Sequence, residues 1–270
     1  MEQTSGVDQP AAVHPLTGID PLASFKLRDK VVVLTGASSG LGERFARVID
    51  ALGATSVLAA RRRDRLDTLV SELSRAEAVA CDVGEDGANE ALIQGVLDRH
   101  GRVDVVIANA GITNPMPAAK EEVSDYRKVM EIDLVAPFAL AKAAQPAMRS
   151  QKAGSIVMVA SVAGLRSMSL LPQASYVAAK SGLIGLTREL ALQWARHGIR
   201  VNALCPGMFP SEMTSDVTDH SSIKEMFEGA IPLRRLGRSD ELDGAIAFLA
   251  SDASSYMTGQ TLVMDGGVSC

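Results

Sequence analysis

A short apolar run, Val31–Thr35 (VVVLT), leads directly into a segment with three glycines, TGASSGLG at 35–42. The run is apolar at nearly every position, which is typical of a parallel strand that helices cover on both faces. An amphipathic stretch follows, from about Leu41 to Leu52. A strand, a glycine-rich turn and a helix in this order predict the first unit of an α/β fold.

Short apolar runs and longer amphipathic stretches alternate along the rest of the chain. Further strands are expected at Ser56–Ala60, Ala78–Cys81, Val103–Ala108, Ser155–Ala160, Ile199–Cys205 and Thr261–Met264. Further helices are expected near 64–74, 86–99, 124–148, 174–196, 211–228 and 239–251. Crossovers of this length predict an open, doubly wound parallel sheet, in which ligands bind beyond the carboxyl ends of the strands.

No internal repeat and no break in composition divides the chain after its first residues. We therefore expect residues 28–270 to form a single domain. Residues 1–27 contain Pro10, Pro15 and Pro21 and little periodic apolar pattern. They are expected to form a mobile N-terminal arm, with Leu22 to Leu27 resting on the domain.

Composition excludes several classes of function. The formal net charge of −5 argues against nucleic acid or an anionic membrane as the main partner. No apolar run approaches the roughly 20 residues that a membrane-spanning helix needs, and the first residues lack the pattern of a secretory signal. The three cysteines and four histidines have no metal-site spacing. We expect a reduced, cytoplasmic protein without a bound metal.

The glycine segment has the spacing that phosphate binding requires. Gly36 permits a tight turn off the strand, Gly40 lets a backbone approach a pyrophosphate, and Gly42 allows close packing of helix on strand. The helix N-terminus then offers free N–H groups to the anion. Ser38, Ser39 and Leu41 lie in the same loop. We therefore expect a dinucleotide cofactor here.

The end of the second strand discriminates between the two nicotinamide cofactors. A carboxylate at that point would bind the ribose 2′-hydroxyl of NAD, but the sequence reads Ala60-Arg61-Arg62-Arg63. Guanidinium groups at this point favour the 2′-phosphate of NADP, with Arg61 and Arg62 as its partners. A solvated helix start is the alternative reading, and NAD remains open.

Five motifs in order resemble the short-chain dehydrogenase/reductase family from about Lys30 to the C-terminus. They are TGxxxGxG at 35–42, an altered NNAG at Ala108–Gly111, Ser161 with the YxxxK pair Tyr176 and Lys180, Pro206-Gly207, and VMDGG at Val263–Gly267. The resemblance implies a Rossmann-like fold and NAD(P)-dependent interconversion of a ketone and a secondary alcohol.

The residues themselves account for such chemistry. A free phenol, with a pKa near 10, is a poor acid–base catalyst at neutral pH. Lys180 lies one helical turn after Tyr176, so its ammonium can stabilise the phenolate of that residue. The Ser161 hydroxyl can polarise the carbonyl oxygen. We expect Tyr176 to act as the general acid and base.

The resemblance also assigns the remaining cofactor contacts. It implies that Asp82 and Val83 bind the adenine and that Lys180 also holds the nicotinamide ribose. The further implied contacts, from the fourth strand end to the segment after the sixth, are Asn109, Ala110, Gly111, Pro206, Gly207, Met208, Phe209 and Ser211. The stretch Met208–Gly229, rich in Met and Phe, is interpreted as a lid over a hydrophobic substrate, with a packed helix pair as the alternative.

Two features depart from the family pattern. Asp133 stands where a catalytic Asn is usual, at a turn whose main chain takes part in a proton relay. Either the main chain suffices, or an ionised carboxylate near Lys180 changes the local pKa values. We favour the first, because a buried ionised carboxylate is costly without a well-formed pair. The segment between Ser161 and Tyr176 is also about two residues longer than is common, which weakens any analogy of substrate.

Several functions remain in competition. An NADP-dependent carbonyl reductase or alcohol dehydrogenase is favoured, with a 3-oxoacyl-thioester reductase as its leading specific version. The alternatives are an NAD-dependent sugar-acid or polyol dehydrogenase and a cofactor-sensing binding protein without turnover. Relatives usually form tetramers. A homotetramer is expected here, with contacts through the small residues of 139–148 and the apolar residues Leu183, Ile184, Leu186, Leu190 and Trp194.

Overall fold

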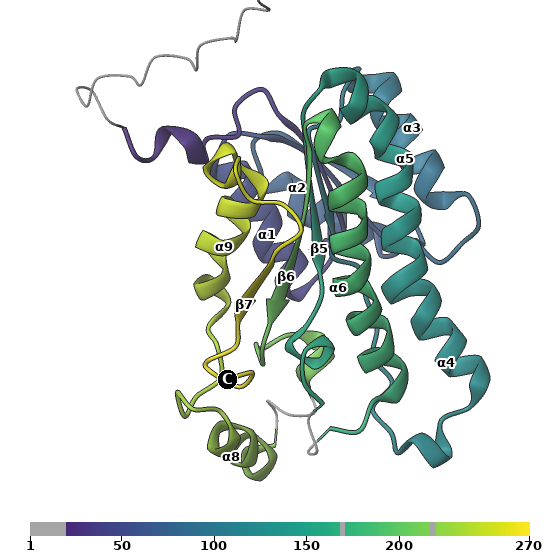
Figure 1. The fold of residues 1–270 in the computed structure, drawn as a ribbon, viewed down its shortest axis with the longest axis vertical. Helices are drawn as coiled ribbons and strands as arrows, with labels where there is room; N and C mark the ends of the chain where they lie inside the picture. Colours follow the sequence, from purple (N-terminus) through teal and green to yellow (C-terminus); the bar gives the residue numbers. More distant parts are fainter. Residues whose placement is uncertain (1–19, 168–170, 216–219) are drawn as a thin grey trace, which may run out of the picture.

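The computed structural model describes residues 20–167, 171–215 and 220–270. Within these ranges seven strands form one parallel sheet in the order β3-β2-β1-β4-β5-β6-β7. Figure 1 shows the sheet with helices on either side of it. Its strands are β1 Val31–Thr35, β2 Thr55–Ala60, β3 Ala76–Ala80, β4 Val105–Ala108, β5 Gly154–Val159, β6 Ile199–Pro206 and β7 Thr261–Met264. The predicted doubly wound α/β fold is confirmed.

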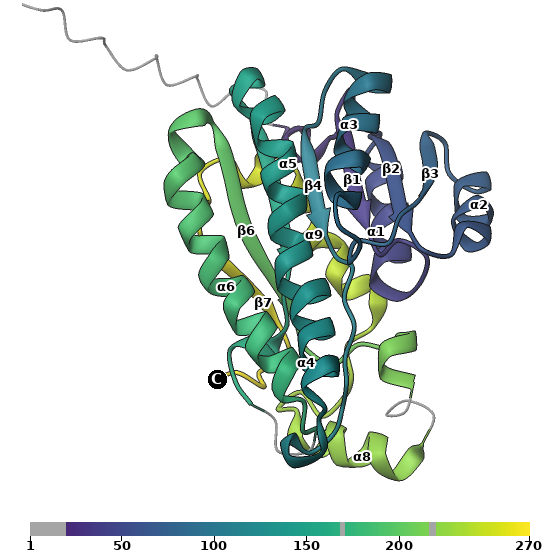
Figure 2. The same cartoon turned by 90° about the vertical axis from the view of Figure 1, so that its right-hand side faces the viewer.

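Helices cover both faces of the sheet. The described helices are α1 Gly40–Ala51, α2 Arg63–Ser71, α3 Ala88–His100, α4 Val123–Met130, α5 Ala136–Gln151, α6 Ala174–Trp194, α8 Ser221–Ala230 and α9 Asp243–Ala250. Figure 2 shows α4, α5 and α6 in front of the sheet, and α9 lies behind it. No helix in the described part of the chain is long and apolar enough to span a bilayer.

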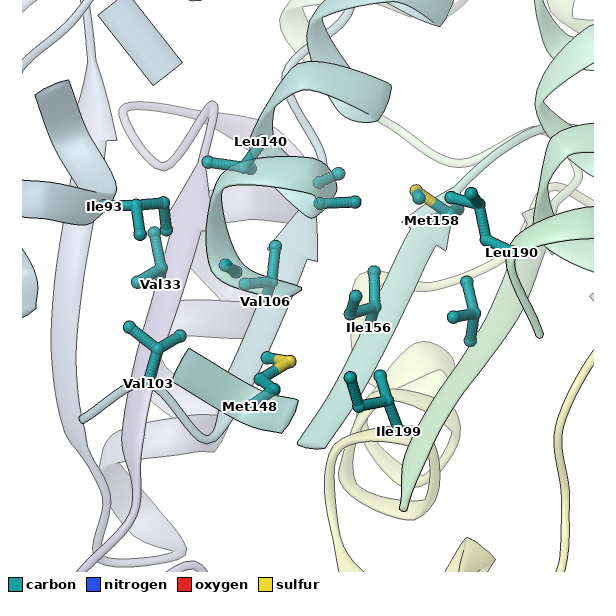
Figure 3. Close-up of a cluster of buried hydrophobic side chains, with 14 of the residues drawn as sticks. Val33, Ile93, Val103, Val106, Leu140, Met148, Ile156, Met158, Leu190 and Ile199 are labelled. Carbon is teal, nitrogen blue, oxygen red and sulfur yellow. The ribbon is translucent and has the colours of Figure 1, made fainter. Parts of the chain in front are cut away.

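Alternation along β1 explains why its strand is apolar throughout. Val31 and Val33 belong to the cluster beneath α3, α5 and α6, whereas Val32 and Leu34 belong to the cluster beneath α1, α2 and α9. Successive side chains of a strand point to opposite faces, so both faces need apolar residues. In Figure 3, Ile93 of α3 and other helical side chains pack against Val33 and strand residues such as Val106 and Ile156.

The connections after β1 and β4 position the site. β1 pairs with β2 on one side and with β4 on the other, with Val32 opposite Ser56 and Val105. The chain therefore leaves these two neighbouring strands toward opposite faces of the sheet, since α1 and α5 lie in different clusters. This reversal opens a crevice at the carboxyl ends of the strands.

Three expected helices differ from those observed. The stretch 124–148 is two helices, α4 and α5, joined by a π-helical turn at Glu131–Val135. The stretch 211–228 contains a 3₁₀ turn, Glu212–Thr214, before α8, with residues 216–219 outside the described part. The stretch 239–251 begins with a 3₁₀ turn, Ser239–Leu242, before α9. Apolar periodicity does not distinguish these turns from an α-helix.

The expected N-terminal arm falls mostly in residues 1–19, which lie outside the described residues. Of its remaining part, Leu27 is 1% exposed and belongs to the core cluster beneath α1. Its N–H donates to the carbonyl oxygen of Leu52 at 2.9 Å. By contrast, Leu22 is 66% exposed. The last residues before β1 are therefore part of the packed domain.

Candidate active site

One pocket gathers nearly all of the predicted site residues at the carboxyl ends of β1, β2, β4, β5 and β6. Those that line it are Gly36, Ser38, Ser39, Gly40, Leu41, Gly42, Arg61, Arg62, Asp82, Val83, Asn109, Ala110, Gly111, Ser161, Tyr176, Lys180, Pro206, Gly207, Phe209 and Ser211. Asp133 lies behind Lys180 instead, with an exposed fraction of 0%. The sequence motifs, spread over 176 residues from Gly36 to Ser211, thus meet at one place.

The glycine loop has no room for side chains. Gly36 has a φ of +69°, and a Cβ there would lie 2.7 Å from the Cα of Ala110. A Cβ on Gly42 would lie 2.1 Å from the carbonyl oxygen of Gly36. The side chain of Asn109 fixes the loop, since its Nδ2 donates to the carbonyl oxygens of Thr35 and Gly36 at 3.0 and 3.2 Å. The loop and the free N–H groups of α1 form a cradle that suits a pyrophosphate.

Ser161, Tyr176 and Lys180 form the second part of the pocket. Ser161 follows β5, and its Oγ accepts a hydrogen bond from the N–H of Ala163 at 3.1 Å. Tyr176 and Lys180 lie one turn apart on α6, with the Lys180 Nζ 5.5 Å from the centre of the Tyr176 ring. Burial, aided by the negative charge of Asp133, raises the pKa of Tyr176 overall, although the positive charge of Lys180 and the hydrogen bond with Ser161 act to lower it.

Asp133 pairs directly with Lys180. Its Oδ2 lies 3.1 Å from the Lys180 Nζ, and its Oδ1 accepts a hydrogen bond from the N–H of Ile112 at 2.8 Å. The Nζ also donates to the carbonyl oxygen of Val159 at 3.0 Å. Burial lowers the pKa of Lys180, but Asp133 and Tyr176 outweigh that effect and raise it overall. A main-chain role was expected at this turn because a buried carboxylate is costly without a partner, and Lys180 is such a partner.

The opposite end of the pocket carries a second set of charges. Arg62 donates to the Oγ of Ser38 at 3.1 Å and to the Oγ of Ser39 at 2.8 Å. Its Nη2 also donates to Glu212 Oε2 at 2.8 Å, and the other oxygen of Glu212 accepts from Arg65. Arg61 is exposed at the same end. Guanidinium groups beside the phosphate loop suit a further phosphate.

Sequence reasoning missed several residues of the pocket. Glu212 is the most prominent, and it lies 150 residues from Arg62 in the chain, beyond the reach of any local motif. Thr113 and Gln173 also line the pocket, and the Thr113 hydroxyl donates to the Gln173 Oε1 at 2.9 Å. These residues flank recognisable motifs, but only their position in the fold brings them to the site.

The wall near Ser161 is mainly apolar. Leu171 and Met208 pack against the apolar cluster that contains Val162, the residue after Ser161, and all three line the pocket. Ile112 and Met213 line it as well. In the described part of the chain, the cations that line the pocket are Arg61, Arg62 and Lys180. The space beside Ser161, Tyr176 and Lys180 therefore suits an apolar group better than an anionic one.

Comparisons with known proteins agree with this geometry. The family described as enoyl-(acyl carrier protein) reductase matches residues 36–269. The chain is 36% identical over 248 residues to a 3-oxoacyl-[acyl-carrier-protein] reductase from Synechocystis, covering 90% of this chain and 98% of the relative. It is 33% identical over 267 residues to a D-arabinitol 2-dehydrogenase from Candida tropicalis, covering 92% and 95%.

Solved structures give the same result. A short-chain type dehydrogenase/reductase from Mycobacterium marinum superposes with a TM-score of 0.89 at 32% identity, covering 93% of this chain and all of the other. A gluconate 5-dehydrogenase from Burkholderia cenocepacia, solved with NADP and tartrate, has a TM-score of 0.86 at 31% identity, covering 92% and 98%. With its phosphate loop, its serine–tyrosine–lysine cluster and these relatives, the chain belongs to the short-chain dehydrogenase/reductase family of NAD(P)-dependent oxidoreductases.

Proposed function

We propose that this chain is an NADP-dependent enzyme that interconverts a ketone and a secondary alcohol, with Tyr176 as the general acid and base. The observation that carries the proposal is the convergence of Ser161, Tyr176 and Lys180 on the pocket that also contains the glycine loop. A general acid within the same pocket as a phosphate cradle is what reduction of a carbonyl group requires.

Each side chain has a distinct task in this proposal. A nicotinamide bound in the pocket supplies the hydride that reduces the carbonyl carbon. The Tyr176 hydroxyl donates its proton to the carbonyl oxygen, and the Ser161 hydroxyl stabilises the negative charge that develops on that oxygen. The Lys180 ammonium, kept charged by Asp133, stabilises the Tyr176 phenolate that remains. In the oxidative direction the same phenolate accepts the proton.

The residues present fit a dinucleotide with a 2′-phosphate. The loop from Gly36 to Gly42 would hold the pyrophosphate, because the N-terminus of α1 has no side-chain cap and its N–H groups are available to an anion. Arg61 and Arg62 would bind the 2′-phosphate, which is a dianion. The related structures whose names include NADP, among them that of Pseudomonas aeruginosa RhlG, support this choice.

A mainly apolar ketone, such as a 3-oxoacyl thioester, is the substrate class that we favour. The wall formed by Val162, Leu171 and Met208 offers apolar contact next to Ser161. A sugar-acid dehydrogenase needs a cation for the carboxylate of its substrate. Among the described lining residues, Lys180 is already paired with Asp133, and Arg61 and Arg62 lie at the end of the pocket next to the glycine loop. The related 3-oxoacyl-[acyl-carrier-protein] reductases agree with this preference.

Fluorescence titration with NADPH and NADH tests the proposal first. We expect tighter binding of NADPH, followed by its oxidation in the presence of 3-oxoacyl thioesters and other hydrophobic ketones. A panel that includes polyols with NAD and sugar acids with NADP covers the alternative substrates. Binding of cofactor without turnover of any carbonyl compound or alcohol would favour the cofactor-sensing protein instead.

Assembly into a homotetramer remains part of the proposal, but its expected contact residues need correction. Leu183, Ile184 and Leu190 are 0%, 3% and 3% exposed because they pack in the core beneath α6. Exposed apolar side chains on these two helices include Phe138, 39% exposed on α5, and Leu192, 80% exposed on α6. Sedimentation velocity at micromolar concentration is expected to give a tetramer, and a monomer would contradict it.

A further inference from the structure

Glu212 connects the segment that follows β6 with the segment that follows β2, and both segments border the cofactor pocket. It lies at the start of the 3₁₀ turn Glu212–Thr214, in the segment that follows β6. Its two carboxylate oxygens accept hydrogen bonds from Arg62, just after β2, and from Arg65 on α2. The end of the pocket that contains Arg62 therefore also contains a negatively charged side chain, that of Glu212.

This carboxylate shares its donors with the phosphate loop. The Arg62 Nη2 that donates to Glu212 at 2.8 Å also lies 2.8 Å from the Oγ of Ser39 and 3.1 Å from the Oγ of Ser38. An anion that entered between the loop and α2 would need the same guanidinium group. The carboxylate and that anion would therefore compete for Arg62.

The carboxylate is a weak competitor that is present at every working pH. Hydrogen bonds from Arg62 and Arg65 lower the pKa of Glu212 to about 2, so it stays ionised in neutral solution. The side chains of Arg62 and Glu212 are 40% and 50% exposed. Ion pairs this exposed contribute little and are easily exchanged. A phosphate monoester, with nearly two charges and three acceptor oxygens, is the stronger partner.

We propose that Glu212 is an internal competitor for the 2′-phosphate of NADP and thereby sets how strongly this pocket prefers NADPH to NADH. The proposal rests on the proposed function, in which Arg62 binds the 2′-phosphate. NADH carries a hydroxyl at that position and leaves the Glu212–Arg62 pair in place. Glu212 thus weakens NADPH binding while leaving NADH binding nearly unchanged.

The segment that carries Glu212 also carries residues of the opposite end of the pocket. The Thr214 hydroxyl donates to the carbonyl oxygen of Phe209 at 2.7 Å and accepts from the N–H of Ser211 at 2.9 Å. Phe209 and Met213 both line the pocket. These hydrogen bonds lie within the segment and do not involve Glu212, so replacing Glu212 should leave the segment in place.

The test compares Glu212→Gln with the wild type by calorimetry on the protein without cofactor, using adenosine 2′,5′-bisphosphate and 5′-AMP as probes. We expect the variant to bind the bisphosphate about fivefold more tightly, the scale of an exposed ion pair. Binding of 5′-AMP is expected to change less than twofold. Titrations with NADPH and NADH are expected to show the same contrast.

Glu241→Gln is the matched control. Glu241 also accepts hydrogen bonds from a nearby arginine, Arg235, and its pKa is likewise lowered to about 2, but it does not line the pocket. Both probes are expected to bind this variant as they bind the wild type. A gain in bisphosphate binding in Glu241→Gln as large as that in Glu212→Gln would overturn the proposal, because a general change in charge would then explain it.

A further variant, Arg62→Ala, separates failure of this inference from failure of the cofactor assignment. If Arg62→Ala loses bisphosphate binding but Glu212→Gln gains none, Arg62 binds the phosphate and the competition is refuted. If neither substitution changes the ratio of the dissociation constants of the two probes, both the competition and the assignment of Arg62 are refuted. A weaker binding of bisphosphate in Glu212→Gln would also overturn the competition, because Glu212 would then support the site.

Discussion

The two ends of the pocket each contain an ion pair, and the pairs differ in their exposure to solvent. Lys180 and Asp133 lie 3.1 Å apart with side chains 4% and 0% exposed. Arg62 and Glu212 lie 2.8 Å apart with side chains 40% and 50% exposed. The shorter contact is thus the more exposed one, so distance alone does not rank these pairs.

Burial decides what each pair can do. Removing one partner of a buried pair leaves an uncompensated charge and costs roughly 3–5 kcal/mol. An exposed pair contributes roughly 0–1 kcal/mol, and water or a ligand can replace either partner. The buried pair is therefore a fixed part of the catalytic end, whereas the exposed pair is suited to exchange with a ligand.

The largest effect is expected from Tyr176→Phe, which tests whether chemistry is confined to the buried end. Turnover should fall by about 10² to 10⁴, because the proton donor is removed. Binding of NADPH and thermal stability should remain close to those of the wild type. Tyr256→Phe is the control, since Tyr256 is fully exposed and does not line the pocket. Near-normal turnover of Tyr176→Phe would rule out its role as the acid.

Lys180→Met and Arg62→Met compare the two pairs directly through stability. Lys180→Met leaves Asp133 buried beside an apolar side chain, so the free energy of unfolding should fall by roughly 3–5 kcal/mol. Arg62→Met should change it by no more than about 1 kcal/mol. Urea unfolding measures both, and adding Asp133→Asn to Lys180→Met should recover part of the loss. Equal losses in the two single variants would remove the distinction between the pairs.

The arginines at the exposed end are expected to contribute unequally to cofactor choice. Arg62→Ala should weaken binding of NADPH by roughly 1.5–3 kcal/mol, the value of a charge-assisted hydrogen bond. Arg61→Ala should cost less, because Arg62 rather than Arg61 is positioned by Ser38 and Ser39. Binding of NADH should change little in either variant. A wild type that already prefers NADH would contradict the assignment of NADP.

The smallest effect on turnover is expected from Asp133→Asn, and it concerns pH dependence. The Asp133 carboxylate raises the pKa of Lys180 and also raises that of Tyr176. Its replacement by a neutral amide should lower both pKa values, so the inflection of the pH–rate profile that reports Tyr176 should move to lower pH. The maximal rate should change little. An unchanged profile would mean that only the main chain acts at this turn.

Local motifs account for what the sequence predicted well. The strands of the sheet are continuous apolar runs, and Ser161, Tyr176, Lys180 and the glycine loop are recognised within a few residues of chain. The ion pairs are different, because each depends on a contact between distant segments. Asp133 was recognised from the family pattern, but its ion pair with Lys180 became evident only in the fold, and Glu212 was not recognised before the fold placed it beside Arg62. Pairing across the fold has no signature in one sequence.

The helix boundaries were predicted less well for a related reason. The apolar pattern of 124–148 continues through the π-helical turn, so periodicity predicted one helix where the structure has α4 and α5. The turn depends on Asp133 facing inward, where its Oδ1 accepts from the N–H of Ile112. Ile112 belongs to the loop after β4, so the apolar pattern of the helix alone could not predict this contact.

The π-helical turn at Glu131–Val135 also determines how this region can change in length. Such a turn is equivalent to one extra residue within an α-helix. Deleting a residue here would let the helix become regular and would rotate α4 by about 100° relative to α5. All of α4, which packs against α6, would then present a different face to its neighbour. The exposed positions of this stretch can accept new side chains. A change in its number of residues, however, would change the direction in which Asp133 faces.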